Sequence, residues 1–423
     1  MTKKATKVTN MKRLILLSVL AASPLLAADF QLTDMIELRV IDPASDGGQL
    51  GRAVALTGDT AWFGAPQANS FDGRTWRSEV DSSGQFGPLS PLATTGETPF
   101  RFGDDIAVDG DWAAVGYYSD NRFDLYHRNG SSWILAGSQE APDVPDITIR
   151  GMARDMDLKD DLLVVSAAPS NVGAIGNAGA VLVFRRDLGG SGNWGLEATL
   201  IAPSPASGNN FGISVSGAED TIAVGDDVDE TVYIYRFASG TWDFDKTLVP
   251  VGQATDDNFG VSVAVEGDIV AVGATNGNDA PSPSNSGSVH LFHRDVGGAG
   301  NFGQIDQIAP STPDSIDRYG EVVVLNDGVL MVGAPGANQA YAYADLGAGW
   351  QEIAFLVPPP AEDFFNALFG SDVDYDDGRI LVGAQRWDDT TSDEEDGAVF
   401  MFQSDAIMAC GVIDAIFCDR FEQ

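Results

Sequence analysis

The sequence is short of positive charge. Its 423 residues contain 24 Lys and Arg against 62 Asp and Glu, so the formal net charge is −38. A chain this acidic repels a phosphate backbone, which argues against nucleic acid and anionic lipid as partners. The hydrophobic fraction of 44% nevertheless predicts a folded core rather than a disordered chain.

Residues and motifs that carry common catalytic chemistry are also scarce. There are only three histidines, His127, His290 and His293, and none belongs to a His-Glu-x-x-His motif. The sequence has no Gly-x-Ser-x-Gly elbow and no phosphate-binding glycine loop. We therefore assign no catalytic residue, although with so many acidic residues a pair of carboxylates could meet in the folded chain and hydrolyse a sugar polymer.

No apolar run is long enough to span a bilayer, and the longest run lies near the N-terminus. A basic stretch, 3–13, precedes the apolar run 14–26 and the small pair Ala27-Ala28. This order is typical of a secretory signal peptide, and the run is too short to span a bilayer. We expect residues 1–28 to be a signal peptide, with translation starting at Met1 or Met11, no membrane span, and a protein that is secreted, periplasmic or on the cell surface. A buried N-terminal helix is the alternative.

Cysteine is nearly absent. Cys410 and Cys418 lie in a C-terminal tail, 405–423, outside the repeats described below. In an exported protein we expect these two residues to form one disulfide, and the fold of the remaining chain cannot depend on it.

A repeated sequence motif occupies most of the remaining chain. Its clearest copy, 259–274, reads as an alternating strand from Phe259-Gly260, a tight turn at Gly267-Asp268, and a second apolar strand. Six further copies are recognised, the third of them degenerate, and the residues at the glycine position are Gly51, Gly103, Ala153, Gly212, Gly260, Gly320 and Gly370. The spacing of about 50 residues is that of one four-stranded propeller blade.

Each copy continues with a third strand around an aromatic residue and a fourth strand that often ends near a proline. The aromatic residues are Trp76, Tyr126, Phe184, Tyr235, Phe292, Tyr343 and Phe402. The seventh copy has no fourth strand, whereas residues 35–41 form an unassigned strand of the same pattern. We predict an all-β fold over 29–404, a seven-bladed β-propeller of four-stranded antiparallel blades whose last blade is closed by the N-terminal strand. An open solenoid is the alternative.

Phe-Gly followed by Gly-Ala-Pro, repeated around a ring, resembles the FG-GAP repeat family, which is known from the integrin alpha-chain head and from many secreted bacterial proteins. The resemblance implies a seven-bladed propeller used for binding or adhesion, often with calcium in Asp-x-Asp-x-Asp-Gly loops. In this chain the motif strands are joined by short turns such as 266–268, which leave no room for such a loop. The tail also resembles short C-terminal endings of some secreted bacterial proteins, which implies a sorting or docking tag.

Acidic clusters are the candidate cation sites. Hard cations bind several convergent carboxylate oxygens, and a loop between strands can supply them. The strongest candidate comprises Asp388, Asp389, Asp393 and Asp396, with Glu394 and Glu395 between them, and a merely solvated acidic loop is the alternative. Asp226, Asp227, Asp229 and Glu230 form a second acidic turn, and the segment 372–378 resembles a calcium loop with its glycine one place late.

We therefore expect an exported, monomeric, non-catalytic propeller whose variable loops between strands bind an extracellular protein or polysaccharide, with calcium as the possible cofactor. Two other hypotheses remain open. One is a hydrolase or lyase acting on an extracellular polysaccharide, which a buried carboxylate pair with shifted pKa values would favour. The other is a structural component of an envelope or matrix assembly, which a large apolar surface patch would favour.

Overall fold

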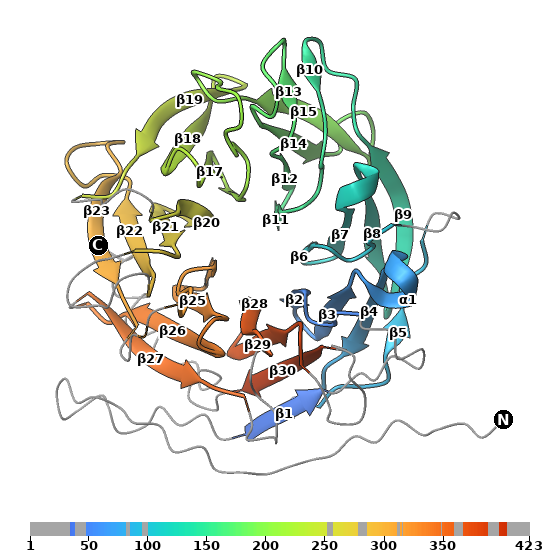
Figure 1. Ribbon diagram of the computed structural model, residues 1–423. Helices are drawn as coiled ribbons and strands as arrows, with labels where there is room; N and C mark the ends of the chain where they lie inside the picture. The colour runs from blue at the N-terminus through green and yellow to red at the C-terminus, as the bar shows by residue number, and fades with distance from the viewer. Residues whose placement is uncertain are drawn as a thin grey trace, which may run out of the picture.

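Seven four-stranded antiparallel sheets form a closed ring, as Figure 1 shows. The computed structural model describes residues 34–38 (backbone only), 48–81, 85–94, 100–251, 257–277, 286–310, 314, 316–347, 349–358, 367–387 and 397–403. The predicted seven-bladed all-β propeller is confirmed. The predicted signal peptide 1–28 and tail 405–423 lie outside the described residues, as do Cys410 and Cys418.

The blades follow one another along the chain, each with its first strand at the centre of the ring (Figure 1). Blades 1 to 3 consist of β2 (Ala53–Thr57), β3 (Thr60–Ala65), β4 (Arg74–Glu79) and β5 (Ser90–Pro91); β6 (Ile106–Asp109), β7 (Trp112–Tyr117), β8 (Arg122–Asn129) and β9 (Ser132–Glu140); and β11 (Met156–Lys159), β12 (Leu162–Ala167), β14 (Ala180–Arg186) and β15 (Trp194–Leu200).

Blades 4 to 6 have the same order of strands. They consist of β16 (Val215–Ala218), β17 (Thr221–Asp226), β18 (Thr231–Ala238) and β19 (Thr241–Leu248); β20 (Phe259–Glu266), β21 (Ile269–Ala274), β22 (Ser288–His293) and β23 (Gly303–Ile308); and β24 (Val322–Asn326), β25 (Val329–Ala334), β26 (Gln339–Asp345) and β27 (Trp350–Leu356). The small elements are α1 (Ala68–Phe71), the 3-10 turn η1 (Tyr118–Asp120) and the hairpin of β10 (Ile147–Thr148) with β13 (Asn171–Val172).

Blade 7 contains both ends of the described chain. Its strands β28 (Phe369–Asp376), β29 (Arg379–Ala384) and β30 (Ala398–Gln403) are followed by β1 (Asp34–Leu38) at the outer edge. β1 pairs antiparallel with β30, from Asp34 opposite Gln403 to Leu38 opposite Val399. The outer edge of β30 is therefore covered by a strand from the other end of the sequence.

The core lies between the blades. The second strand of a blade is buried along nearly its whole length, as in β12 and β25. The predicted aromatic residues of the third strands are all at least 92% buried, with Trp76 at 8% exposure the most exposed and Tyr126 at 1% the least. Burial of both faces of a sheet explains why these strands are nearly continuous apolar runs rather than alternating ones.

The glycines of the repeat let neighbouring blades touch through their backbones. A Cβ added to Gly273 of blade 5 would lie 2.0 Å from the carbonyl oxygen of Gly320 in blade 6, and one added to Gly225 would lie 2.0 Å from that of Gly260. Gly320 and Gly260 themselves have φ values of 85° and 92°, which side chains disfavour. The degenerate third copy keeps the same left-handed conformation at Ala153, with φ 65°.

Connections lie on both faces of the ring. First and second strands are joined by two-residue turns in every blade, such as 58–59 and 327–328. The face with these turns also carries the connections between third and fourth strands, which vary in length and include 130–131 and 294–302. Second and third strands are joined on the opposite face by segments that range from 118–121 and 335–338 to 168–179 and 275–287. Because the strands are antiparallel, connections between blades reach this same variable face, which we call the loop face.

Candidate functional site

The first strands of all seven blades, β2, β6, β11, β16, β20, β24 and β28, surround a central channel. It has a volume of about 440 Å³, within the size range of small-molecule sites. Side chains alternate along a strand, and residues four and six places after the glycine position line the channel in every blade. Residues two places after it line the channel in blades 2, 3, 6 and 7. Several of these are acidic, including Asp105, Asp155, Asp157, Asp372 and Asp374.

The carboxylates of blade 7 bind the exposed edge of blade 1. Backbone N–H groups of Val54 and Leu56 donate to Asp372 Oδ2 at 2.7 Å and to Asp374 Oδ2 at 2.6 Å. Two residues further along each segment, Gly58 N donates to Asp376 Oδ2 at 2.6 Å. The segment 372–378 therefore belongs to a strand and its turn, and three of its carboxylates join the last blade to the first.

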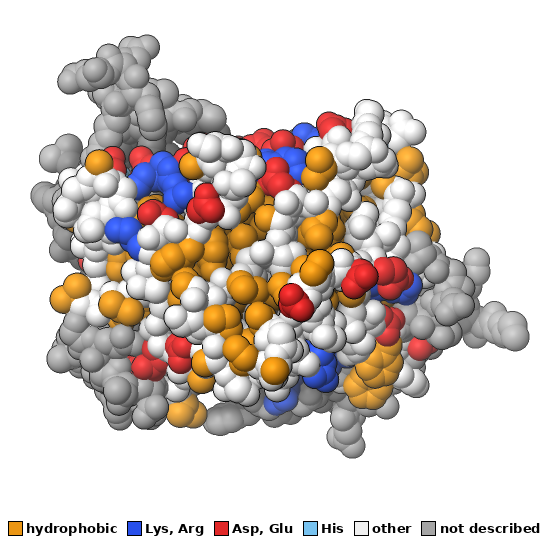
Figure 2. All heavy atoms as spheres, turned by 90° about the horizontal axis from the view of Figure 1, so that it is seen from above, with side chains coloured by type: hydrophobic (Ala, Val, Ile, Leu, Met, Phe, Trp, Pro, Cys, Tyr) orange, Lys and Arg blue, Asp and Glu red, His pale blue; other side chains and the backbone are white. Residues whose placement is uncertain are grey.

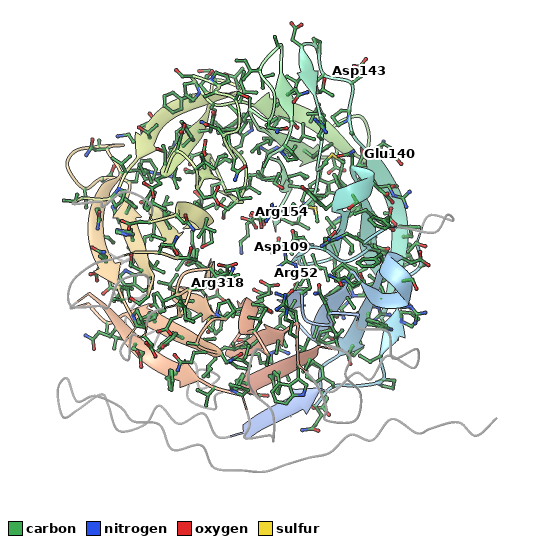
Figure 3. The ribbon with its side chains drawn as sticks, in the orientation of Figure 1. Arg52, Asp109, Glu140, Asp143, Arg154 and Arg318 are labelled. Atoms are coloured by element: carbon green, nitrogen blue, oxygen red, sulfur yellow. The ribbon has the colours of Figure 1, made fainter. Side chains whose placement is uncertain are left out.

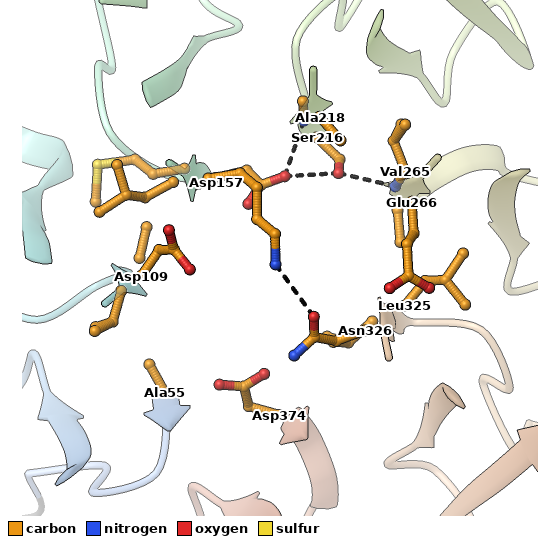
Figure 4. A pocket seen from close by; sticks show the side chains of 18 of the residues that line it. Ala55, Asp109, Asp157, Ser216, Ala218, Val265, Glu266, Leu325, Asn326 and Asp374 are labelled. Carbon is orange, nitrogen blue, oxygen red and sulfur yellow. Dashed lines mark hydrogen bonds between the residues drawn. The ribbon is translucent and has the colours of Figure 1, made fainter. Parts of the chain in front are cut away.

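Other blades are linked in the same way around the channel. Val215 N donates to Asp155 Oδ2 at 2.6 Å, and the Ser216 hydroxyl donates to Asp157 Oδ2 at 2.7 Å. Ser216 Oγ in turn accepts a hydrogen bond of 3.0 Å from Val265 N, as Figure 4 shows. Channel side chains of one blade thus satisfy N–H groups at the free strand edge of the next blade.

Burial raises the pKa values of these carboxyl groups. The pKa of Asp374 is raised to about 8, mainly by burial, and that of Asp372 to about 7. Asp155 also has a pKa of about 7, because burial outweighs the hydrogen bond from Val215 N. Burial, followed by the charges of Asp155 and Asp372, raises the pKa of Asp105.

The two ends of the channel differ. At the end with the two-residue turns, Lys159 Nζ of blade 3 donates across the channel to Asn326 Oδ1 of blade 6 at 3.2 Å (Figure 4). At the loop face, Arg52 and Arg154 lie at the inner ends of blades 1 and 3 (Figure 3). Arg52 lowers the pKa of both Asp155 and Asp372, and Arg154 lowers that of Asp155, so both guanidinium groups act on the upper part of the channel.

The predicted cation residues Asp388, Asp389, Asp393 and Asp396 lie outside the described residues, so their role stays a prediction. Within the described ranges, no group of three or more His, Cys, Asp or Glu side chains is arranged to hold a metal ion.

The carboxylates of the second acidic turn, at the end of β17, accept hydrogen bonds from the turn itself and from neighbouring segments. Asp226 Oδ1 accepts from Asp229 N at 3.0 Å, and Asp227 Oδ1 accepts from the Asn210 amide at 2.9 Å. Glu230 Oε1 accepts from Asn258 N at 3.1 Å in the next blade.

The histidines are parts of the sheets. His290 is 4% exposed in β22, where its Nε2 lies 3.2 Å from Ser288 Oγ and its Nδ1 lies 3.3 Å from Gln304 Nε2. His127 and His293 are half-buried, and the ring of His127 lies 4.6 Å from that of Trp112.

Arginines that share this repeat position form ion pairs between strands. This position directly follows the aromatic residue of the third strand, and Arg236 there pairs with Asp220 of the turn before β17. Arg294, next to His293 in blade 5, reaches the same Asp220 at 3.0 Å.

Sequence reasoning missed the shared role of the channel carboxylates. It singled out 372–378 only as a resemblance to a calcium loop, although Asp105, Asp155 and Asp372 occupy the same repeat position, two places after the glycine position. The recurrence of aspartate at this repeat position was the sequence signal for a shared role in the channel. The partners of these side chains are backbone groups of another blade, which no local pattern reveals.

Comparison with known proteins agrees with the repeat. The FG-GAP repeat family matches residues 194–235 and 242–292, which run from the fourth strand of one blade to the third strand of the next. No curated protein matches the sequence. In the described part of the chain, no helix has the length and apolar character needed to cross a membrane.

Several solved structures share the fold at low sequence identity. A streptogramin B lyase has a TM-score of 0.57 at 12% identity, over 88% of this chain and 97% of that chain. A protein from Lactobacillus plantarum has a TM-score of 0.54 at 14% identity, covering 82% and 99%, and the WD40 domain of Toxoplasma gondii coronin has 0.54 at 8%, covering 85% and 82%. With the matched repeat and seven four-stranded blades, this chain is a β-propeller of the FG-GAP repeat type.

Proposed function

We propose that the protein is an exported, monomeric binding or adhesion module that holds an extracellular protein or polysaccharide through its loop face, without catalysis. The observation that carries this proposal is the variation in length of the connections on the loop face. Every turn between first and second strands has two residues, whereas the connections on the loop face vary from 118–121 to 275–287. Variable loops on a rigid scaffold are the usual place of a binding site.

The ring supplies the rigidity that such a site needs. Neighbouring blades touch through backbone at Gly273 and Gly320, and channel side chains bond adjacent blades. Loops fixed at both ends to buried strands lose less freedom on binding than loops on a mobile support. The N-terminal segment 1–28, which has the order of a signal peptide, supports an extracellular ligand.

Loop shortening tests the proposal. We would replace each long connection, 66–73, 168–179, 275–287 and 385–397, with the four residues of 335–338, and measure binding to immobilised pectin, alginate, dextran and fibronectin. The control changes the turn 267–268, on the opposite face, to Asn-Gly. At least one shortened loop is expected to abolish binding while the control retains it. The proposal is overturned if wild-type protein binds none of these, or if binding survives all four replacements.

We also propose a calcium site at Asp388, Asp389, Asp393 and Asp396, since carboxylates at this density suit a hard cation. Calcium should raise the melting temperature, because a ligand that binds only the folded state stabilises it. Changing the four residues to Asn should remove the effect, whereas changing Asp226, Asp227 and Asp229 should not. A melting temperature that does not respond to calcium or chelator contradicts this site.

A second candidate function is a hydrolase or lyase acting on an extracellular polysaccharide. The observation that favours it is the set of channel carboxyl groups with raised pKa values, Asp155 and Asp372 at about 7 among them. Their hydrogen bonds to Val215 N and Val54 N give them a structural role as well. Release of reducing ends or unsaturated products from pectin, lost in Asp155→Asn and Asp372→Asn, would support this candidate over binding alone.

A third candidate, a component of an envelope or matrix assembly, requires a large apolar surface. Figure 2 shows the part of the rim that lies at the top of Figure 1, where apolar side chains occur in patches among polar and acidic ones. Phe244 of β19 is 41% exposed, and Val249 and Val251, which follow this strand, are 54% and 78% exposed. Self-association in sedimentation experiments, lost in Val251→Asp, would favour this candidate.

A further inference from the structure

Two arginines lie at the mouth of the channel. Neither the Arg52 nor the Arg154 guanidinium makes a hydrogen bond or an ion pair within 4 Å among the described residues. Both directly follow the glycine position of their repeats, after Gly51 and Ala153, which brings them to the inner ends of blades 1 and 3 (Figure 3). Arg52 is half-buried and Arg154 is exposed, and their interactions with Asp155 and Asp372 are through charge alone, so the N–H donors of both are available.

The other charged residues at this repeat position are neutralised nearby. Asp104 of blade 2 receives bonds from Arg101, with Nη2 at 2.6 Å and Nε at 3.0 Å. Glu321 of blade 6 pairs with Arg318 in the same arrangement, three residues apart. The remaining equivalent positions hold Ile213, Val261 and Ser371, which carry no charge. At this repeat position the mouth therefore carries two positive charges in excess.

The carboxylates below the rim do not use the arginine donors. Asp155 Oδ2 accepts from Val215 N at 2.6 Å, and the two oxygens of Asp372 accept from Val54 N at 2.7 Å and from Val373 N at 3.0 Å. These bonds hold the carboxylates against the channel wall. The guanidinium groups keep their donors available for a ligand that enters from the loop face.

The chemistry of the channel below the arginines limits which classes of ligand can bind there. Asp105, Asp155 and Asp372 offer polar oxygen atoms at one level of the channel and Ser216 offers one at the next, which suit the hydroxyl groups of a sugar. The volume of about 440 Å³ admits a small molecule or the end of a chain, and excludes a folded protein.

We propose that Arg52 and Arg154 bind the carboxylate of a sugar acid at the channel mouth, with its hydroxyl groups directed toward the carboxyl groups and Ser216 of the channel. The inference rests on the proposed binding function and names the ligand class of that face. Guanidinium groups recognise carboxylates through paired, charge-assisted hydrogen bonds, which explains why two arginines stand here in a chain with so few basic residues.

Calorimetric titration with galacturonate tests the proposal, and galactose, in which a hydroxymethyl group replaces the carboxylate, is the matched ligand control. Galacturonate should bind and galactose should not. Arg52→Gln and Arg154→Gln should each weaken galacturonate binding about ten-fold or more, the usual effect of losing a charge-assisted bond. Arg150→Gln removes the same charge from an exposed arginine of the loop face and should bind like the wild type.

Dependence on pH supplies a second readout. The groups that face the mouth are Arg52, Arg154, Asp105, Asp155 and Asp372, together with the two neutral pairs described above. Protonation of Asp155 and Asp372, whose pKa values are about 7, makes the mouth more positive, so galacturonate should bind more tightly at about pH 6 than at about pH 8.

Three results would overturn the inference: no galacturonate binding, equal binding of galactose, or equal affinity in Arg52→Gln, Arg154→Gln and the wild type. Each of these leaves the dextran and fibronectin arms of the loop-shortening experiment unaffected, because neither ligand is a polymer of sugar acids. Loop-dependent binding without galacturonate binding would refute the sugar-acid site alone. Loss of both would refute the binding function as well.

Discussion

The channel carboxyl groups predict that the fold is less stable in alkaline than in acidic solution. The pKa of Asp374 is about 8 in the folded protein against 3.8 for a free aspartate, and burial is the main cause. The folded state therefore holds a proton that the unfolded state releases. Its contribution to stability is fully present below the unfolded pKa and is lost as pH rises through the folded pKa, so the window is about pH 4 to 8.

The size of the effect follows from the linkage between protons and folding. One proton is worth about 1.4 kcal/mol per pH unit, so Asp374 alone would lower the free energy of unfolding by about 3 to 4 kcal/mol between about pH 5 and pH 8. Because this side chain is half-buried in a channel, we expect solvent to reduce that figure to about 2 kcal/mol.

Denaturant unfolding, followed by tryptophan fluorescence at several pH values, measures how steeply the free energy of unfolding changes with pH. Asp374→Asn removes the titrating group and keeps an oxygen that can accept from Leu56 N, so the variant should show a shallower pH dependence than the wild type. Asp377→Asn, on an exposed neighbouring residue, is the control and should leave the slope unchanged. If Asp374→Asn follows the wild-type slope, or if stability rises from pH 5 to pH 8, the reasoning is refuted.

Three further predictions concern how the blades are joined. Gly273→Ala places a methyl group 2.0 Å from Gly320 O and should cost about 3 kcal/mol in denaturant unfolding, whereas Gly137→Ala, with nothing within 4 Å, should be neutral; equal effects would contradict the contact. Deleting 34–38 uncovers the edge of β30 and should lower the melting temperature and promote dimers in size-exclusion chromatography, and an unchanged melt would show that the strand adds no stability. Asp220→Ala removes one carboxylate from both Arg236 and Arg294 and should cost about 1 kcal/mol, decreasing with added salt; a loss that salt does not change would argue against an ion-pair effect.

The sequence predicts the blades because the repeated residues are themselves the contacts that make a blade. Gly260 is needed for its positive φ, and the turn at 267–268 joins the first two strands, so each leaves a visible mark in every copy. Phe292 and the equivalent aromatics fill the space between sheets and mark the third strands. Even the degenerate copy was placed correctly, because Ala153 adopts the backbone conformation of the glycine that it replaces.

The candidate site could not be predicted in the same way. Alternation shows that Asp372 and Asp155 lie on one side of their strands, but their partners, Val54 N and Val215 N, are backbone groups that look alike in any sequence. Arg52 and Arg154 come from blades that are not neighbours, and only the closed ring brings them to one mouth. That their guanidinium groups make no hydrogen bond or ion pair with the described residues can be seen only in the folded molecule.

The seam between the last blade and the first sets an order on folding. Val54 and Asp372 are separated by 318 positions, so this bond can form only when nearly the whole chain is available. Early closure of so long a loop is entropically costly, whereas assembly of the intermediate blades first brings the two ends together in advance. A chain interrupted before blade 7 would therefore remain an open arc with two unprotected sheet edges. Such an arc is a target for proteolysis and for pairing with another copy, so the ring becomes durable only when its final strand is in place.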